Sequence, residues 1–192
     1  MPERDATDIP TDDPRPDDLR RATSLVLVNT GPGKGKTSAA MGVVIRGVAR
    51  GWAVAVVQFL KSGAWNTGEE KVCRQLDVDW WAMGEGFTWD SADLTQDQAV
   101  AAGAWQHAKD LIRAGDHHLV VLDEVTYPLN WGWIDLADAV ETIRSRPEQV
   151  NVICTGRNAP AELIDIADTV SEIAEVKHAY KAGIRAKKGI DY

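Results

Sequence analysis

The sequence predicts an α/β fold, a mostly parallel sheet with helices on both of its faces. Short, continuous apolar runs such as SLVLVN at 24–29 and AVAVVQFL at 53–60 are typical of strands that are buried on both faces. Segments with apolar residues at helical spacing separate these runs. Strands that alternate with helices predict a parallel sheet, because each connecting helix packs back onto the sheet.

The expected strands differ in their patterns. The run TVSEIAEV at 169–176 alternates between apolar and polar residues and is expected to be an outer strand. Residues 61–94 are mixed and contain one short apolar segment near 78–83. The buried strands are expected at 24–29, 53–60, 117–124 and 151–156.

The expected helices are bounded by recognisable start and stop signals. The segment 37–50 has small and apolar residues at helical spacing and ends before Gly51. A second helix begins at Thr95, where Gln98 completes a capping-box spacing, and it continues to about Arg113. The remaining helices are expected at 135–146, before a proline, and at 160–167.

The chain of 192 residues is expected to form a tail at 1–22 and a single domain at 23–192. The tail is rich in proline and aspartate, so it has almost nothing to bury. We expect it to be flexible, or to become ordered over a bound ligand. The domain is long enough to bury a substantial core without disulfides or a structural metal.

Composition excludes several classes of protein. The 21 Lys and Arg against 29 Asp and Glu give a net charge of −8, which argues against non-specific nucleic-acid binding. No stretch approaches the ~20 apolar residues of a membrane span, and no signal segment opens the chain. The two cysteines have no metal-binding spacing, which favours a reducing, cytoplasmic setting. Eight tryptophans exceed ordinary usage.

A glycine-rich loop, TGPGKGKTS at 30–38, separates the first expected strand from the first expected helix. Glycines let successive backbone N–H groups turn toward an anion, and the helix N-terminus favours negative charge. Gly35, Lys36 and Thr37 match the end of a Walker A loop, in which Thr37 would offer its hydroxyl to Mg²⁺. The strict pattern would begin with glycine at Thr30, so this loop is one residue tighter.

The apolar run VVLDE ends in two carboxylates, Asp123 and Glu124. The carboxyl ends of parallel strands face the same crevice as the glycine-rich loop, so these groups can hold the Mg²⁺ that bridges phosphate oxygens. A solvated acidic pair at a strand end is the alternative reading. Together with the loop, the carboxylates predict that the chain binds a nucleoside triphosphate.

The groups that an ordinary triphosphatase or kinase needs are harder to find. Arg157, in CTGRN after the fourth buried strand, can face a transferring phosphoryl group, and Glu124 is the remaining candidate for a base. None of the four histidines is a clear candidate for a base. Two begin a strand, at the edge of the sheet away from the crevice, one lies within a helix, and the role of the fourth is ambiguous. These are His117 and His118, His107, and His178. Any nucleophile is therefore expected to come with the substrate.

Sequence segments that extend beyond the generic nucleotide motifs resemble the ATP:corrinoid adenosyltransferases of the CobA/CobO/BtuR type. The likeness runs in order from Ser24 to Tyr192 and includes the shortened loop. Its segments are GPGKGKTSAA, VVQFLK, GEGFTW, AWQHAK, VVLDEVTY, TGRN, IADTVSEI and VKHAYKAGIRAKKGIDY. Pro32 departs from the family, in which many members would have Asn or Asp there, so any side-chain contact from that position is lost.

The resemblance implies a RecA-like P-loop fold, usually as a homodimer. It implies transfer of the 5′-deoxyadenosyl group of ATP to the cobalt of a corrinoid, such as cobalamin, with release of inorganic triphosphate. The nucleophile is then Co(I), formed when a reduced flavoprotein delivers an electron to Co(II). Since Co(I) has no proton to remove, the protein needs no base. It has only to position the two substrates, exclude water from them and neutralise the charge of the triphosphate. The metal would be Mg²⁺, or Mn²⁺ in its place.

The resemblance also implies a role for each matching residue. Thr37 and Glu124, with Asp123 nearby, would hold the metal, and Arg157 would neutralise the departing triphosphate. The groups that would hold the triphosphate are Gly31, Gly33, Lys34, Gly35, Lys36, Thr37 and Ser38. Phe87 and Trp89 would lie beside the corrin and displace its lower axial ligand, so that four-coordinate Co(II) accepts an electron more readily. The tail would become ordered over the corrinoid.

Other classes of protein remain as alternatives. A RecA-like ATP hydrolase or kinase would release phosphate and would often respond to a macromolecular partner. The acidic charge and small size count against it. A non-catalytic corrinoid carrier or ATP sensor is disfavoured by the intact Lys36, Thr37 and Glu124, because binding alone would tolerate loss of metal coordination.

Overall fold

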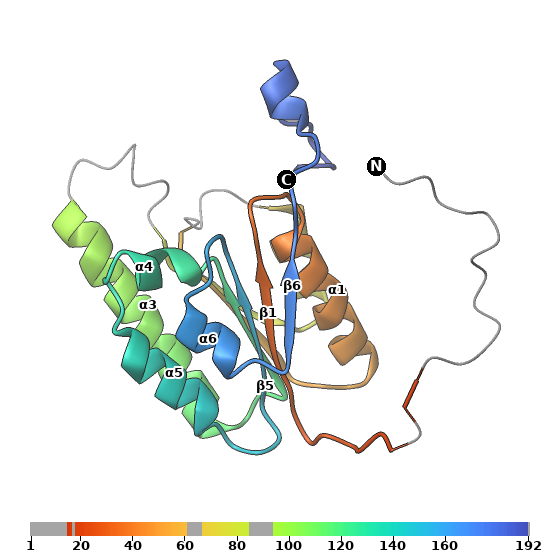
Figure 1. The fold of residues 1–192 in the computed structure, drawn as a ribbon, viewed down its shortest axis with the longest axis vertical. Helices are drawn as coiled ribbons and strands as arrows, with labels where there is room; N and C mark the ends of the chain where they lie inside the picture. Colours follow the sequence, from red (N-terminus) through yellow and green to blue (C-terminus); the bar gives the residue numbers. More distant parts are fainter. Residues whose placement is uncertain (1–14, 17, 61–66, 85–93, 192) are drawn as a thin grey trace.

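A sheet of parallel strands forms the centre of the computed structural model, which describes residues 15–16, 18–60, 67–84 and 94–191 (Figure 1). Within these residues the strand order is β3-β2-β4-β5-β1-β6, and every neighbouring pair is parallel. The strands are β1 Val26–Thr30, β2 Val54–Gln58, β3 Asp79–Ala82, β4 Leu119–Asp123, β5 Asn151–Thr155 and β6 Thr169–Glu172.

Helices cover both faces of the sheet. Helices α1 and α2 pack on one face, and α3, α5 and α6 pack on the other (Figure 1). The helices are α1 Lys36–Ala49, α2 Gly68–Gln75, α3 Leu94–Ala114, α4 Thr126–Asn130, α5 Leu136–Arg144, α6 Ala161–Asp165 and the 3₁₀ helix η3 Ala179–Ala182. The arrangement confirms the predicted α/β fold.

The central strands explain the continuous apolar runs in the sequence. Every residue of β2 and β4 is buried. On β2, Val54 and Val56 face α1 and α2, whereas Ala55 and Val57 face α3. The same alternation on β4 divides its side chains between the two halves of the core. Because both faces of these strands are buried, both sets of alternating positions are apolar, except for Gln58 and Asp123 at the ends of the two strands.

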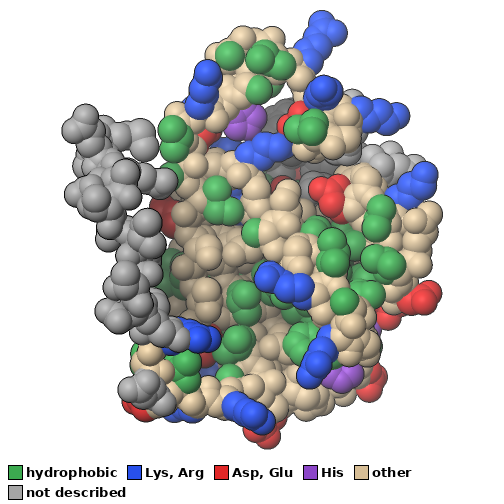
Figure 2. All heavy atoms as spheres, turned by 90° about the vertical axis from the view of Figure 1, so that its right-hand side faces the viewer, with side chains coloured by type: hydrophobic (Ala, Val, Ile, Leu, Met, Phe, Trp, Pro, Cys, Tyr) green, Lys and Arg blue, Asp and Glu red, His purple; other side chains and the backbone are tan. Residues whose placement is uncertain are grey.

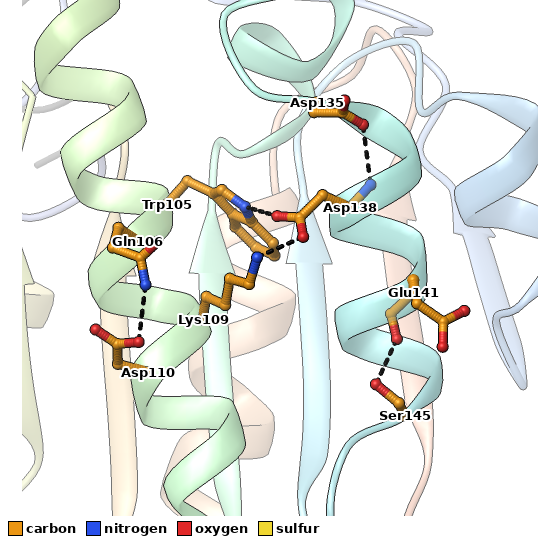
Figure 3. Close-up of polar contacts among 8 residues, drawn as sticks. All are labelled: Trp105, Gln106, Lys109, Asp110, Asp135, Asp138, Glu141 and Ser145. Atoms are coloured by element: carbon orange, nitrogen blue, oxygen red, sulfur yellow. Dashed lines mark hydrogen bonds and ion pairs between the residues drawn. The ribbon is translucent and has the colours of Figure 1, made fainter.

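A polar contact joins α3 to α5 on one face of the sheet (Figure 3). The Asp138 carboxylate accepts a hydrogen bond of 2.8 Å from Trp105 Nε1 and pairs with Lys109 Nζ. These contacts lower the pKa of Asp138, and the hydrogen bond from Lys109 is the largest cause. Asp135 caps the start of α5 by accepting from the Asp138 N–H at 2.9 Å.

Three short elements are additional to those expected from the sequence. Helix α2 is short and strongly polar, and it has a single buried side chain, Cys73. Helix α4 is five residues long and contains Pro128. Helix η3 has no buried side chain. The apolar segment near 78–83 becomes β3, and the outer strand expected at 169–176 ends at Glu172.

Most of the predicted N-terminal tail lies outside the described residues. Among the residues that the structure describes, no helix combines the length and apolarity that would be needed to cross a membrane.

Candidate nucleotide-binding site

The glycine-rich loop follows β1 and packs against the chain that continues β6. The Gly33 N–H donates to the Ile173 carbonyl oxygen at 2.7 Å, and the Ile173 N–H donates to the Thr30 carbonyl oxygen at 2.9 Å. A Cβ at Gly31 would lie 2.6 Å from the Ile173 oxygen, and one at Gly33 would lie 2.5 Å from the Ala174 oxygen. The close approach of two backbones therefore requires glycine at both positions.

Gly35 is required for a different reason. Its φ of +122° lies in a region that residues with a Cβ rarely adopt, although no atom lies within 4 Å of the position that a Cβ would occupy. Helix α1 begins at the next residue, Lys36. Lys36 Nζ donates to the carbonyl oxygens of Gly31, at 2.8 Å, and Gly33, at 2.6 Å, so the ammonium group lies inside the loop.

The Lys36 ammonium group is destabilised in this position. Burial and then the positive charge of Arg157 lower the pKa of Lys36, and Glu124 partly opposes the shift. Negative charge beside Lys36 would favour its charged form. A polyanion is therefore the ligand that this loop is suited to bind.

Asp123 is the fully buried centre of a hydrogen-bond network at the end of β4. Its Oδ1 accepts from the hydroxyls of Thr37, at 2.9 Å, and Thr155, at 2.7 Å. Its Oδ2 accepts from Gln58 Nε2 at 2.9 Å, and Gln58 Oε1 accepts from Trp80 Nε1 at 3.2 Å. The network fixes the first turn of α1 relative to β2, β4 and β5.

Glu124 turns out of the sheet toward the loop. Its φ of +64° is unusual for a residue with a side chain, and its N–H donates to Thr155 Oγ1 at 2.9 Å. Tyr127 lies one turn further along. Burial and then the nearby Glu124 raise the pKa of the Tyr127 phenol.

Arg157 follows β5 in a tightly packed turn. The preceding Gly156 has a φ of +140°, and a Cβ there would lie 2.0 Å from Thr126 Oγ1. The same Thr126 hydroxyl donates to the Arg157 carbonyl oxygen at 2.7 Å. Helix α4 therefore holds the backbone that carries Arg157 beside the phosphate loop.

These elements enclose a cavity of about 250 Å³ at the carboxyl edge of the sheet. Most of the site residues predicted from the sequence line it: Gly33, Lys34, Gly35, Lys36, Thr37, Ser38, Glu124 and Arg157. Gly31 and Asp123 lie behind this lining, in the contacts described above. Phe87 and Trp89 lie outside the described residues, so their expected positions remain predictions.

Five residues of the lining were not nominated from the sequence: Glu69, Tyr127, His178, Ile190 and Asp191. The last three belong to the C-terminal segment, which contains no general nucleotide-binding motif. Asp191 pairs at 2.6 Å with Lys34, which lines the same cavity and is expected to bind triphosphate. A hydrogen bond from the Lys187 N–H, followed by the bond from Lys34, lowers the pKa of Asp191. In the sequence, Asp191 was indicated only by the resemblance of the closing GIDY to the family.

The oxygen donors at the cavity suit a hard cation such as Mg²⁺. The described residues contain no cluster of three or more His, Cys, Asp or Glu side chains that could hold a metal alone. Glu124 and the Thr37 hydroxyl line the same cavity. Mg²⁺ is usually held by one or two protein oxygens together with substrate phosphates, so this donor set fits the ion only when a phosphate is bound.

The sequence model of the family described as "ATP:corrinoid adenosyltransferase BtuR/CobO/CobP" matches residues 22–192. The chain belongs to this family. Its parallel sheet, with the phosphate loop after β1 and the carboxylates after β4, agrees with the RecA-like fold implied for ATP:corrinoid adenosyltransferases.

Curated relatives share this assignment over most of their length. The corrinoid adenosyltransferase of Pseudomonas aeruginosa PAO1 is 45% identical over 175 residues, which are 90% of this chain and 86% of the relative. That of Escherichia coli K12 is 42% identical over 168 residues, 88% and 85% of the two chains. Corrinoid adenosyltransferase CobA of Salmonella typhimurium LT2 is 41% identical with the same coverage. The resemblance inferred from sequence is confirmed.

Proposed function

We propose that this member of the ATP:corrinoid adenosyltransferase family transfers the 5′-deoxyadenosyl group of ATP to the Co(I) centre of a corrinoid. The cavity that brings Lys36, Glu124 and Arg157 together supports the proposal most directly. In the reaction, the electron pair of Co(I) forms the bond to the 5′ carbon. The bond between that carbon and the triphosphate oxygen breaks, and its electron pair leaves with inorganic triphosphate.

The residues of the cavity are suited to a leaving group that gains negative charge. Lys36 and Arg157 supply positive charge, and the backbone N–H groups at the start of α1 supply hydrogen-bond donors. Preorganised donors of this kind stabilise charge where it develops in the transition state. Because Co(I) carries no proton, the proposed reaction requires no protein base.

We expect Mg²⁺, or Mn²⁺ in its place, to be held by Thr37 and Glu124. The metal would neutralise charge on the phosphate oxygens. The Thr37 hydroxyl donates a hydrogen bond to Asp123, which leaves the oxygen lone pairs of Thr37 available for a cation. Asp123 would then act by orienting Thr37, and its own oxygens would stay engaged with Thr155 and Gln58.

The corrinoid would bind beside Phe87 and Trp89, where bulky apolar groups would exclude water and an axial ligand from the cobalt. Trp89→Ala should therefore leave ATP affinity unchanged but slow adenosylation when the electron donor is weak. The measurement compares a physiological flavoprotein donor with a strong chemical reductant. Full activity of the variant with the flavoprotein would exclude the proposed role of Trp89.

The electron donor in this proposal is a reduced flavoprotein, and the setting is the cytoplasm. We further propose a homodimer, with an N-terminal tail at 1–22 that becomes ordered over the corrinoid and a catalytic domain at 23–192. Removal of residues 1–20 should then weaken corrinoid binding without changing ATP binding. Unchanged corrinoid kinetics in the truncated protein would overturn this part of the proposal.

Product analysis tests the proposed reaction. The protein is incubated anaerobically with ATP, Mg²⁺ and a chemically reduced corrinoid, and phosphate, diphosphate and triphosphate are separated. The expected result is one triphosphate for each light-sensitive adenosylated corrinoid, with no product from Lys36→Ala. Conversion of ATP to ADP and phosphate, independent of corrinoid, would instead establish the hydrolase alternative.

A further inference from the structure

The C-terminal segment 176–190 has one half-buried side chain. Every residue of this fully described stretch is exposed except His178, which is half-buried. His178 lines the nucleotide cavity together with Lys36 and Arg157. Apolar residues such as Val176 and Tyr180 remain 94% and 78% exposed, so hydrophobic burial does not explain why the histidine is the least exposed residue of the segment.

One nitrogen of the His178 ring is already engaged. Nδ1 accepts a hydrogen bond of 3.1 Å from the Tyr180 N–H and thereby caps helix η3. A neutral imidazole that accepts through Nδ1 carries its proton on Nε2. The cap therefore selects the tautomer in which Nε2 is a hydrogen-bond donor, and it also limits rotation of the ring.

The segment that carries His178 is attached to the phosphate loop on both sides of the histidine. Before it, the Ile173 carbonyl oxygen accepts from the Gly33 N–H at 2.7 Å. After it, Asp191 pairs with Lys34 at 2.6 Å. Attachment at both ends holds His178 against the cavity, which reduces the entropy lost when a ligand binds there.

We propose that His178 binds the triphosphate chain of ATP, with Nε2–H donating a hydrogen bond to a phosphate oxygen. The inference rests on the proposed function for the identity of the nucleotide. The C-terminal segment is then a wall of the binding site, and it retains the leaving group while the bond to the 5′ carbon breaks. A hydrogen bond to a charged oxygen is stronger than a neutral one, so His178 acts in parallel with Lys36 and Arg157.

Two substitutions separate the functions of the two ring nitrogens. His178→Asn retains an acceptor close to the position of Nδ1, so it preserves the cap on η3 but cannot reach the cavity. His178→Gln places an amide N–H group near the position of Nε2 but loses the cap. His118→Asn is the matched control, because His118 is exposed at the opposite edge of the sheet and its Nδ1 also accepts from a backbone N–H, that of Ala53.

Binding of inorganic triphosphate to the full chain is measured by titration calorimetry, and thermal unfolding is recorded for each variant. His178→Asn should bind triphosphate about tenfold more weakly, with an unchanged melting temperature. His178→Gln should stay within about threefold of the unsubstituted protein, and His118→Asn should not differ from it. Unchanged binding by His178→Asn would overturn the proposal, as would equal losses in both His178 variants. If His178→Asn does not fold, triphosphate binding by His178→Gln tests the proposal: an affinity within about threefold of the unsubstituted protein supports it, and a larger loss overturns it.

The product assay keeps this inference separate from the proposed function. Weak triphosphate binding by His178→Asn, in a protein that never adenosylates corrinoid, would preserve the assignment of His178 and overturn the proposed reaction. Normal adenosylation by the unsubstituted protein, with unchanged triphosphate binding by His178→Asn, would preserve the proposed reaction and overturn the assignment of His178.

Discussion

Gly33 and Gly35 lack side chains for different physical reasons, and substitution by alanine distinguishes them. Gly33→Ala would force Cβ against the Ala174 carbonyl oxygen and push the loop away from the chain after β6. Gly35→Ala would meet no atom but would adopt an unfavourable φ, at a cost of about 1–3 kcal/mol. We expect both variants to bind inorganic triphosphate at least about tenfold more weakly in titration calorimetry.

Gly42 supplies the control for these two glycines. It lies within α1, has no atom within 4 Å of a Cβ position and does not have a positive φ. Gly42→Ala should raise the free energy of unfolding by about 1 kcal/mol and leave triphosphate binding unchanged. If Gly33→Ala behaved like Gly42→Ala, the contact between the loop and the Ala174 backbone would not be a constraint on the site.

The lowered pKa of Lys36 predicts a pH dependence of ligand binding. Phosphate oxygens beside Lys36 would favour its ammonium form, so the pKa of Lys36 should be higher in the complex than in the ligand-free protein. The complex then binds the proton more tightly, and triphosphate affinity should fall as the pH rises through the pKa of the ligand-free protein. Calorimetry in buffers of different ionisation enthalpy should detect proton uptake on binding. Proton release on binding would contradict this prediction.

The residues of the site that could be predicted from sequence are those in local motifs. Lys36, Thr37 and Glu124 lie next to glycine, lysine and aspartate residues whose spacing is characteristic of phosphate binding. His178 and Asp191 reach the cavity only because β6 continues past the loop and the C-terminal segment follows it. No short-range pattern encodes that path, so sequence reasoning left His178 ambiguous.

At the scale of elements, Asp138 couples α3 to α5 and should contribute to stability. Asp138→Asn should lower the free energy of unfolding by about 1 kcal/mol near neutral pH, because Lys109 loses its charged partner and Trp105 Nε1 loses a charged acceptor. The pKa of Asp138 is lowered in the folded protein, so its contribution is complete above the pKa of the unfolded chain. The difference between the two proteins should shrink as the pH falls below about 4.

Asp110 on α3 is the matched control for Asp138. Its Oδ1 accepts from Gln106 at 2.8 Å on the exposed side of the same helix and joins no second element (Figure 3). Asp110→Asn should change the free energy of unfolding by less than about 0.5 kcal/mol. Urea unfolding of both variants at several pH values makes the comparison. Equal effects of the two substitutions would mean that Asp138 does not couple the helices.

For most elements, predictability followed the amount of apolar surface that the element buries, whereas the exposed strand β6 was predicted from its alternating pattern. Strand β4 is buried throughout, and its apolar run was recognised directly. Helix α2 is eight residues long and strongly polar, and α4 is five residues long and contains a proline, so neither presents the long apolar stripe from which a helix is predicted. Tertiary contacts hold both in place: Cys73 packs into the core, and Thr126 bonds to the Arg157 backbone.

At the scale of the whole molecule, positive charge is concentrated beside the nucleotide cavity. The segment 176–190 contains no carboxylate, although the whole chain has a net charge of −8. In Figure 2 the Lys and Arg side chains stand out around the protruding upper part of the molecule, where Figure 1 places this segment. Its cations are Lys177, Lys181, Arg185, Lys187 and Lys188, and all of them are exposed.

This asymmetry should steer anionic ligands toward the cavity, because an exposed cluster of one sign accelerates the association of ligands of the opposite sign. Simultaneous Lys177→Gln, Arg185→Gln and Lys188→Gln substitution should slow association of inorganic triphosphate several-fold at low salt and leave dissociation nearly unchanged. Stopped-flow measurements over a range of salt concentrations should show a flatter salt dependence for the variant.

The control for steering changes the net charge by the same amount at the opposite edge of the sheet. Arg50, Arg113 and Arg144 are exposed at or near the C-terminal ends of α1, α3 and α5, whereas α1 begins at the phosphate loop. Replacing these three arginines by glutamine should slow association much less when the two variants are compared at about 0.1 M salt, since screening then limits the reach of exposed charges to about 10 Å. An equal effect of the two triple substitutions would assign the acceleration to net charge, and the location of the C-terminal cations beside the cavity would then have no kinetic role.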